Sequence, residues 1–251
     1  LNFYAQKEER KLSYTYAFGV VPAEAPLYYQ TEEYGTRLRW APRERLVKME
    51  QLEAILYPVF PILDFTMAHL AVDDFTAQRF TARLQHEQRW KFIGMTEITL
   101  ETGWLSKALP YPYLFQAPGN SQNGITGNGL FNTAGVTEFA QEKFAYLFVT
   151  HRFGTLLGRL KTPYFRPELR LMQQLGWGKL SMASQHQGLD FQDMRRGYLE
   201  SGAGLDNILR IPYFKTVYIG LGASVWYRWG AYHLPAFKDN VRVQFTVNIS
   251  V

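Results

Sequence analysis

The sequence predicts an all-β protein, an antiparallel transmembrane β-barrel of about ten strands. The clearest sign is the last segment, Val241 to Val251, in which apolar and polar residues alternate without a break. The segment before it, Thr216 to Trp229, repeats the pattern. Because successive side chains of a strand point to opposite faces, both segments have one apolar face. About ten such residues are enough for a tilted strand to cross the hydrocarbon core of a bilayer.

Composition agrees with this class. Hydrophobic residues make up 47% of the 251 residues, and aromatic residues make up 16%, including 16 Tyr and 6 Trp. Tyr and Trp rings are apolar with one polar tip, which suits a membrane interface. No apolar run approaches the roughly 18 residues of a membrane-spanning helix, and only helices and closed barrels satisfy every backbone group in lipid. A soluble, aromatic-rich β-sandwich is the alternative.

Other classes have less support. The absence of cysteine excludes a disulfide framework and a thiolate metal site. The net charge of +5 is carried by scattered Lys and Arg, which gives little support for nucleic-acid binding. The sequence begins at Leu1 without a charged and apolar leader, so any export signal is expected to have been removed or to lie outside it.

The first half is expected to contain five strands. Residues 1–6 fit the tail of an earlier strand, and Val20 to Tyr34 reads as a loop. Pro42 to Glu53 is the one stretch compatible with a short helix or a long turn. Pro58 and Pro61 delay the third strand, since proline cannot donate to a sheet ladder. The expected strands cover residues 12–18, 37–40, 60–67, 80–87 and 97–104.

The second half is expected to contain five more strands. Between the two halves, residues 105–141 are rich in Pro, Gly and Asn, and a loop of that length is usually functional. Residues 180–196 form a second loop. The expected strands cover residues 143–154, 168–179, 197–207, 216–229 and 241–251.

The loops are expected to alternate in length. Wide loops should follow strands one, three, five, seven and nine, as in outer-membrane barrels, where long loops face outside and short turns face the periplasm. With a periplasmic C-terminus, the extracellular side would be dominated by loop 105–141. Segments 43–54 and 155–167 are longer than ideal turns.

Four stretches of the second half carry a resemblance: EFAQEKFAYLFVTHRFGTLL (138–157), FRPELRL (165–171), HQGLDFQDMRRGYLESGAGLDNIL (186–209) and YIGLGASVWYRWGAYHLP (218–235). They resemble the C-terminal β-barrel, of unknown function, of a Bacteroidota outer-membrane family in which the barrel follows a carboxypeptidase-regulatory-like domain. The resemblance extends more weakly through LPYPYLF (109–115) back to about Thr36. It implies an integral outer-membrane protein with no catalytic residues to carry over.

The chain departs from that family in two ways. It lacks the regulatory-like domain, so residues 1–251 are expected to be a fragment, which leaves the strand number of the intact barrel open. It also ends in Val251 rather than in the aromatic residue common at the ends of such barrels. A further stretch, RRGY (195–198), is similar to the Arg-Gly-aromatic loop of the barrel-assembly factor superfamily. There the loop precedes more strands than the three that follow here, and we interpret it as a loop Arg beside a strand-opening Gly.

Twelve charged residues lie on the polar faces of the expected strands. Six arginines and six acids cancel, which is typical of a small barrel lumen closed by mutual salt bridges. A charge on the lipid face would cost about 2 to 4 kcal/mol near the midplane. Arg228 and Arg242 flank one loop and suggest a solvated rim near lipopolysaccharide phosphate. The residues expected to face the lumen are Arg37, Arg39, Arg83, Glu87, Glu97, Glu101, Glu168, Arg170, Glu200, Asp206, Arg228 and Arg242.

Catalytic and metal sites have little support. The five histidines lie in different segments with no i, i+4 pair, so neither a metal nor another cofactor is expected. A Ser-His-acid site stays open, because such triads assemble in space, but no Gly-x-Ser-x-Gly elbow is present. His151, between Val149 and Phe153, fits a membrane interface better than a catalytic base. The glycines of 119–129 lack the lysine of a phosphate loop.

We therefore expect a non-catalytic outer-membrane barrel with a structural, transport-associated or assembly-associated role. Its partners would be outer-membrane lipid, lipopolysaccharide and other outer-membrane proteins, with no nucleic acid. Three alternatives stay open: a gated channel or transporter with a charged lumen, an outer-membrane lipase or protease, and a soluble β-sandwich binding module.

Overall fold

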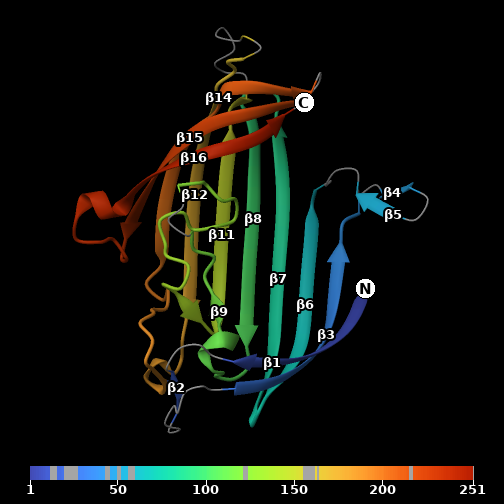
Figure 1. The fold of residues 1–251 in the computed structure, drawn as a ribbon, viewed down its shortest axis with the longest axis vertical. Coiled ribbons are helices and arrows are strands. Elements are labelled where there is room, and N and C mark those ends of the chain that lie inside the picture. The colour runs from blue at the N-terminus through green and yellow to red at the C-terminus, as the bar shows by residue number, and fades with distance from the viewer. Residues whose placement is uncertain are drawn as a thin grey trace.

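The computed structural model describes residues 1–11, 16–19, 28–42, 46–49, 52–55, 60–120, 124–154, 162, 164–214 and 217–250. Its main feature is one sheet of ten strands, each antiparallel to its neighbours (Figure 1). The strands, in spatial order, are β1 (Asn2–Lys11), β3 (Tyr28–Trp40), β6 (Ile62–Val72), β7 (Phe75–Trp90), β8 (Gly94–Leu105), β11 (Lys143–Arg152), β12 (Glu168–Lys179), β14 (Tyr198–Phe214), β15 (Val217–Gly230) and β16 (Val241–Ser250). The prediction of an all-β, antiparallel protein is confirmed.

Short elements connect these strands. Three two-stranded sheets are formed by β2 (Ala17–Phe18) with β13 (His186–Gln187), β4 (Leu46–Met49) with β5 (Leu52–Ile55), and β9 (Phe115–Gln116) with β10 (Ala140–Gln141). Single 3₁₀ turns are η1 (Tyr111–Tyr113), η3 (Ala183–Gln185) and η4 (Phe237–Asn240). Among the described residues, no helix is long and apolar enough to cross a membrane.

The sheet is curved, and residues 105–120 and 124–141 lie on its concave side (Figure 1). We call this side the inner face and the opposite side the outer face. Within the described ranges, no strand pairs with the free edge of β1 or of β16. The described strands therefore do not close on themselves, and a closed barrel stays a prediction.

Several element predictions need correction. The first strand of the sheet is Asn2–Lys11 rather than residues 12–18, of which 12–15 lie outside the described residues. The expected loop Val20 to Tyr34 ends early, because Tyr28–Trp40 is a strand paired along its length with β1. Pro42 to Glu53 contains neither a helix nor a simple turn in its described part, since Leu46–Met49 pairs with Leu52–Ile55.

The alternation of loop lengths holds at six of the nine connections of the sheet and fails at three. Only Asp73 and Asp74 separate β6 from β7, where a wide loop was expected. Conversely, β3 and β6 are separated by residues 41–61, and β11 and β12 by residues 153–167, where tight turns were expected. Loop length therefore does not distinguish the two ends of this sheet.

The register places a continuous row of apolar side chains on the outer face. Each member is the direct cross-strand partner of the next, over eight neighbouring strands. We call it the leucine row: Trp40, Leu63, Leu84, Leu100, Leu147, Leu175, Leu199 and Trp229. No second sheet of the described chain covers it, and its Leu100 and Trp229 are each 41% exposed.

The residues next to the leucine row in each strand point to the inner face, where they form a second row. On β3, β6, β7 and β8 it consists of direct cross-strand partners of alternating sign. We call it the charge row: Arg39, Asp64, Arg83 and Glu101. In these two adjacent rows, apolar side chains lie on the outer face and charged side chains lie on the inner face.

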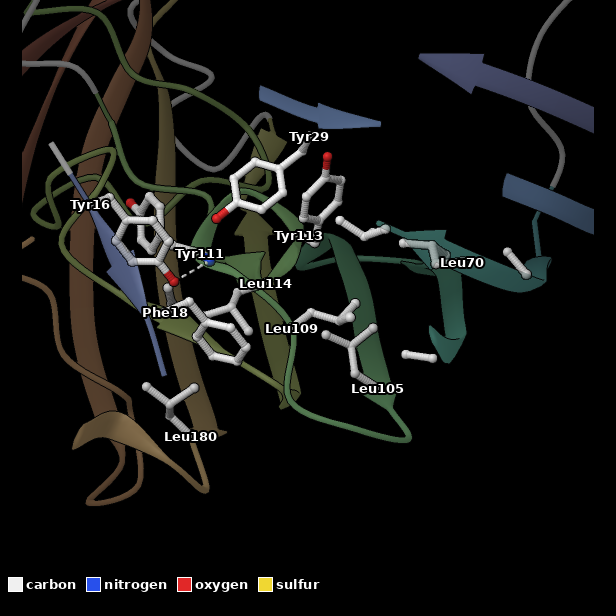
Figure 2. Close-up of a cluster of buried hydrophobic side chains, with 14 residues drawn as sticks. Tyr16, Phe18, Tyr29, Leu70, Leu105, Leu109, Tyr111, Tyr113, Leu114 and Leu180 are labelled. Atoms are coloured by element: carbon white, nitrogen blue, oxygen red, sulfur yellow. Dashed lines mark hydrogen bonds between the residues drawn. The ribbon is translucent and has the colours of Figure 1, made fainter. Parts of the chain in front are cut away.

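The buried apolar residues lie between the inner face and segment 105–141, rather than between two sheets. Figure 2 shows one cluster, in which Leu109, Tyr111 and Leu114 of that segment meet Leu70 of β6 and Leu105 of β8. A second cluster surrounds Phe131, which is fully buried. The segment thus supplies much of the hydrophobic core, to which Tyr16, Phe18, Leu180, Met194 and Tyr232 contribute from other connections.

Candidate functional site: the inner face and its plug

Segment 105–141, which we call the plug, is held to the sheet by one buried carboxylate. Glu200 of β14 is fully buried. Its Oε1 accepts a hydrogen bond from the backbone N–H of Asn132 at 2.6 Å, and its Oε2 accepts one from the N–H of Thr133 at 2.9 Å. The hydroxyls of Thr133 and Tyr198 donate to Oε2 at 2.6 and 3.1 Å. Four donors on one carboxylate fix the middle of the plug against β14.

Inner-face glycines make room for the plug. A Cβ built on Gly176 of β12 would lie 2.8 Å from the ring of Phe131 and 2.8 Å from Sδ of Met194. A Cβ on Gly178 would lie 2.6 Å from the side chain of Gln141. Because only glycine permits these approaches, the small residues on the inner parity of β12 are the reason that Phe131 reaches the sheet.

The plug also reaches the edge of the sheet. The backbone of Phe245 in β16 accepts a hydrogen bond from the N–H of Thr126 at 2.9 Å and donates one to the carbonyl of Gly124 at 2.6 Å. The Thr126 hydroxyl lies 2.6 Å from the Ser224 hydroxyl of β15. At Phe245, the plug therefore satisfies backbone groups that β15 leaves unpaired.

The twelve charged residues expected in a lumen all lie on the inner parity of their strands. Only two ion pairs join members of this set, Arg83 with Glu101 at 3.1 Å and Arg170 with Asp206 at 3.3 Å. Glu200 is held by the plug instead. The others have no ion pair within the set; of them, Arg39, Glu87, Glu97 and Arg228 pair with residues outside it.

The prediction that the twelve residues close a lumen through mutual salt bridges is therefore wrong for most of them. Asp64 binds Arg39 at 3.2 Å, and Arg152 binds Glu97. Asp64 and Arg152 were missed, although strand alternation could have predicted them, because both lie on the same face of their strands as the twelve. Glu138 was undetectable in this way, since it lies in the plug and meets its partner only through the tertiary fold.

Arg228 was expected on a solvated rim, and the structure shows the opposite. Its side chain is 3% exposed, lies 2.6 Å from Glu138, and faces the rings of Tyr198 and Phe139 at 5.0 and 5.6 Å. Arg242, two residues after the end of η4, is only half-buried. A joint rim of these two arginines is therefore not formed.

The histidines do not converge. Among the described residues, no group of three His, Cys, Asp or Glu side chains is placed to hold a metal. His151 lies 2.8 Å from the Thr96 hydroxyl through Nδ1 and 2.9 Å from the Ile93 carbonyl through Nε2. Both ring nitrogens thus meet uncharged groups, with neither a serine nor a carboxylate at hydrogen-bonding distance.

His186 packs against Tyr16 and Phe18 of the cluster in Figure 2. Its Nδ1 lies 2.7 Å from the Tyr16 hydroxyl, which also accepts a hydrogen bond from the N–H of Tyr111 at 2.9 Å. Burial lowers the pKa of His186 to about 4. The imidazole is therefore neutral near pH 7 and has a structural role.

The plug covers only part of the inner face. Beside it, a cavity of about 340 Å³ lies over β3, β6, β7 and β8, and a neighbouring one of about 470 Å³ adjoins plug residues 114–118. Both are lined by Arg37, Thr66, Thr81, Glu101 and Phe144. We call this region the hollow half of the inner face.

Fold and site together define a class: a curved antiparallel sheet with an apolar outer face, a charged inner face and an internal plug. No protein-family model matches the chain, and no curated protein or solved structure matches it either.

Proposed function

We propose that this chain is part of an integral β-barrel of the bacterial outer membrane, of the Bacteroidota type that the sequence resembles. Its role is non-catalytic: structural, or associated with transport or assembly. The observation that carries the proposal is the leucine row, eight apolar residues in direct register on the outer face. A band of this kind matches the outward-facing apolar belt of such barrels.

The exposure of this face supports lipid as its partner. Val243, Phe245 and Val247 are 65%, 68% and 56% exposed on β16. Contiguous apolar surface of this extent is unfavourable in water and marks an interaction site. Since the exposed band crosses most of the sheet rather than one patch, a bilayer fits it better than a single protein partner.

Strand length supports the same assignment. The strands of the leucine row have 10 to 17 residues, as in β11 and β14. A tilted strand crosses the hydrocarbon core with about 9 to 11 residues. Lipid cannot satisfy unpaired backbone groups, so the proposal requires that the edge of β1, and the edge of β16 apart from Phe245, be paired in the membrane.

Two phenylalanines of nearly equal exposure test the proposal. Phe245, on the outer face of β16, is 68% exposed, and Phe237, in η4 outside the sheet, is 70% exposed. An arginine at Phe245 would enter the hydrocarbon, at a cost of about 2 to 4 kcal/mol near the midplane, whereas one at Phe237 would stay in water.

The measurement is folding into phospholipid vesicles, followed by the different gel migration of folded and boiled protein. We expect Phe245→Arg to lower the folded fraction strongly and Phe237→Arg to leave it near the wild-type value. Equal folded fractions for the two variants, or a wild-type chain that stays monomeric in water without detergent, would refute a lipid-facing sheet.

A further inference from the structure

The hollow half of the inner face has one cation without a counter-ion. Its carboxylates are engaged: Glu33 with Arg79 at 3.2 Å, Asp64 with Arg39 at 3.2 Å, and Glu101 with Arg83 at 3.1 Å. Arg37 lines both cavities, is exposed, and has no ion pair or hydrogen bond within the described part of the chain. Arg37 is therefore the one arginine of the cavity walls without a carboxylate partner among the described residues.

Two hydroxyls lie next to that charge. Arg37, Thr66 and Thr81 are successive cross-strand partners on β3, β6 and β7, so their side chains share one row of the inner face. Neither threonine hydroxyl has a hydrogen-bond partner among the described residues. Cross-strand partners lie about 5 Å apart at Cβ, a spacing that lets one small molecule contact all three side chains.

The same row ends in an aromatic wall. After Thr81 come Gly103 of β8 and Phe144 of β11. Without a Cβ at Gly103, the Phe144 ring lies over the glycine and packs edge-to-face on Phe115 of the plug, with ring centroids 4.8 Å apart. The hollow thus has the cationic guanidinium of Arg37 at one end, two hydroxyls on its floor and an aromatic ring at the other end.

We propose that this hollow binds a small hydroxylated organic acid, of the size and chemistry of one acidic sugar ring. The Arg37 guanidinium would bind the carboxylate through two N–H groups. Thr66 and Thr81 would hydrogen-bond the ligand hydroxyls, and Phe144 would contact the apolar face of the ring. A volume of about 340 Å³ accommodates such a molecule.

The site is independent of what covers the outer face, so it can fail while the membrane proposal stands. The test uses the full chain, folded in detergent micelles at low salt, titrated with D-glucuronate and, as a neutral ligand of the same ring size, D-glucose. Calorimetry or saturation-transfer NMR gives the affinity. We expect glucuronate to bind at least about tenfold more tightly than glucose, the effect of one charge-assisted bidentate contact.

Variants assign the binding to this hollow. Arg37→Gln should weaken glucuronate binding about tenfold and leave glucose unchanged. The matched control is Arg89→Gln, because Arg89 is 83% exposed and lies six residues beyond Arg83 on β7. The double variant Thr66→Val with Thr81→Val, which keeps Arg37, should weaken both sugars.

Three results would overturn the proposal. They are equal affinity of the wild-type chain for the two sugars, no binding of glucuronate by folded wild type, and unchanged glucuronate binding in a folded Arg37→Gln variant. Should Arg37→Gln fail to fold, unchanged binding in the threonine double variant would refute the site instead.

Discussion

Glu200 is a fully buried carboxylate whose partners are neutral donors: two backbone N–H groups and two hydroxyls. A buried charge is tolerated when hydrogen bonds replace its lost hydration. Three of these four donors come from the plug, so the same interactions that stabilise the charge also determine where Asn132 and Thr133 lie. Sequence parity placed Glu200 on the inner face, but its partners in the plug lie 67 and 68 residues away.

Replacing this carboxylate should loosen the plug. In Glu200→Gln, one amide NH₂ would face backbone N–H donors, leaving buried donors unpaired at a cost of about 2 to 3 kcal/mol. We expect faster hydrogen exchange at the amides of Asn132 and Thr133 and a lower urea midpoint. Glu168→Gln is the control, since Glu168 lies half-buried on the same face without a contact to the plug. Unchanged exchange at both amides would contradict this role.

His186, which contacts Tyr16 and Phe18 of the cluster in Figure 2, should make that cluster sensitive to acid. Its pKa of about 4 in the fold lies below the ordinary value of 6.5, because burial disfavours the imidazolium. The unfolded chain therefore binds more protons between these two values, and stability falls as the pH is lowered from 6.5 to 4. The loss at pH 4 is at most about 3 kcal/mol, since one pK unit corresponds to about 1.4 kcal/mol.

Denaturant unfolding in detergent at pH 7 and pH 4.5 measures this effect. His186→Phe keeps a ring of similar size without a titrating nitrogen, so its stability should depend less on pH than that of the wild type in this window. His233→Phe provides the control, because His233 lies in the turn after β15. An equal pH dependence of His186→Phe and wild type would show that other groups cause the acid sensitivity.

At the scale of elements, alternation in the sequence predicted the strands whose two faces differ most. In β15, even-numbered residues such as Ser224, Trp226 and Arg228 are buried and odd-numbered ones such as Val225 are exposed, as the pattern requires. Only the first part of β1 was predicted, as the tail of an earlier strand in residues 1–6, because its sequence NFYAQKEERK is polar on both faces. Its partner β3 fixes it through ten residue pairs, which a local pattern cannot contain.

The plug could not be derived from local patterns either. Its Pro, Gly and Asn content indicates a long connection, and a free loop outside the sheet was the natural expectation. The deciding contacts are between distant segments, such as Phe131 on Gly176 and Thr133 on Glu200. Inner-face glycines were visible in the sequence, but nothing in it shows which ring they accommodate.

The match between Gly176 and Phe131 is open to a direct test. Gly176→Ala places a methyl 2.8 Å from the Phe131 ring and from Met194, and overpacking of this kind costs about 1 to 3 kcal/mol. We expect a lower unfolding midpoint and faster hydrogen exchange in residues 124–141. Ala203→Val, on the exposed outer face of β14, adds volume without such a contact and should leave both unchanged. An unperturbed plug in Gly176→Ala would mean that the ring does not depend on this glycine.

At the scale of the whole molecule, the inner face divides into a filled and a hollow part. Against β14, β15 and β16, the plug buries Glu200, Trp226 and Gln244. Over β3, β6, β7 and β8, the charge row borders open volume. In a barrel formed as proposed, the plug would therefore narrow the interior from one side, and water would reach the other side.

The plug can be shortened while the pairing of β9 with β10, at its two ends, is kept. The N–H of Ala117 donates to the carbonyl of Phe139 at 3.0 Å, and β9 pairs with β10 just below this hydrogen bond. Residues 118–138 can therefore be replaced by a short glycine-rich turn. The excision removes Phe131, Asn132 and Thr133, and with them the packing on Gly176 and the donors to Glu200.

On the proposal that the strands line a barrel, this excision should raise single-molecule conductance in planar bilayers severalfold over wild type, because the filled half of the inner face becomes accessible to water and ions. A variant that carries a flexible Gly-Ser segment of the original length, without the anchoring side chains, should give intermediate and fluctuating currents. Conductance that stays at the wild-type level in a folded excision variant would mean that residues 118–138 do not obstruct a continuous path, and that the hollow half alone, or no open path, determines permeation.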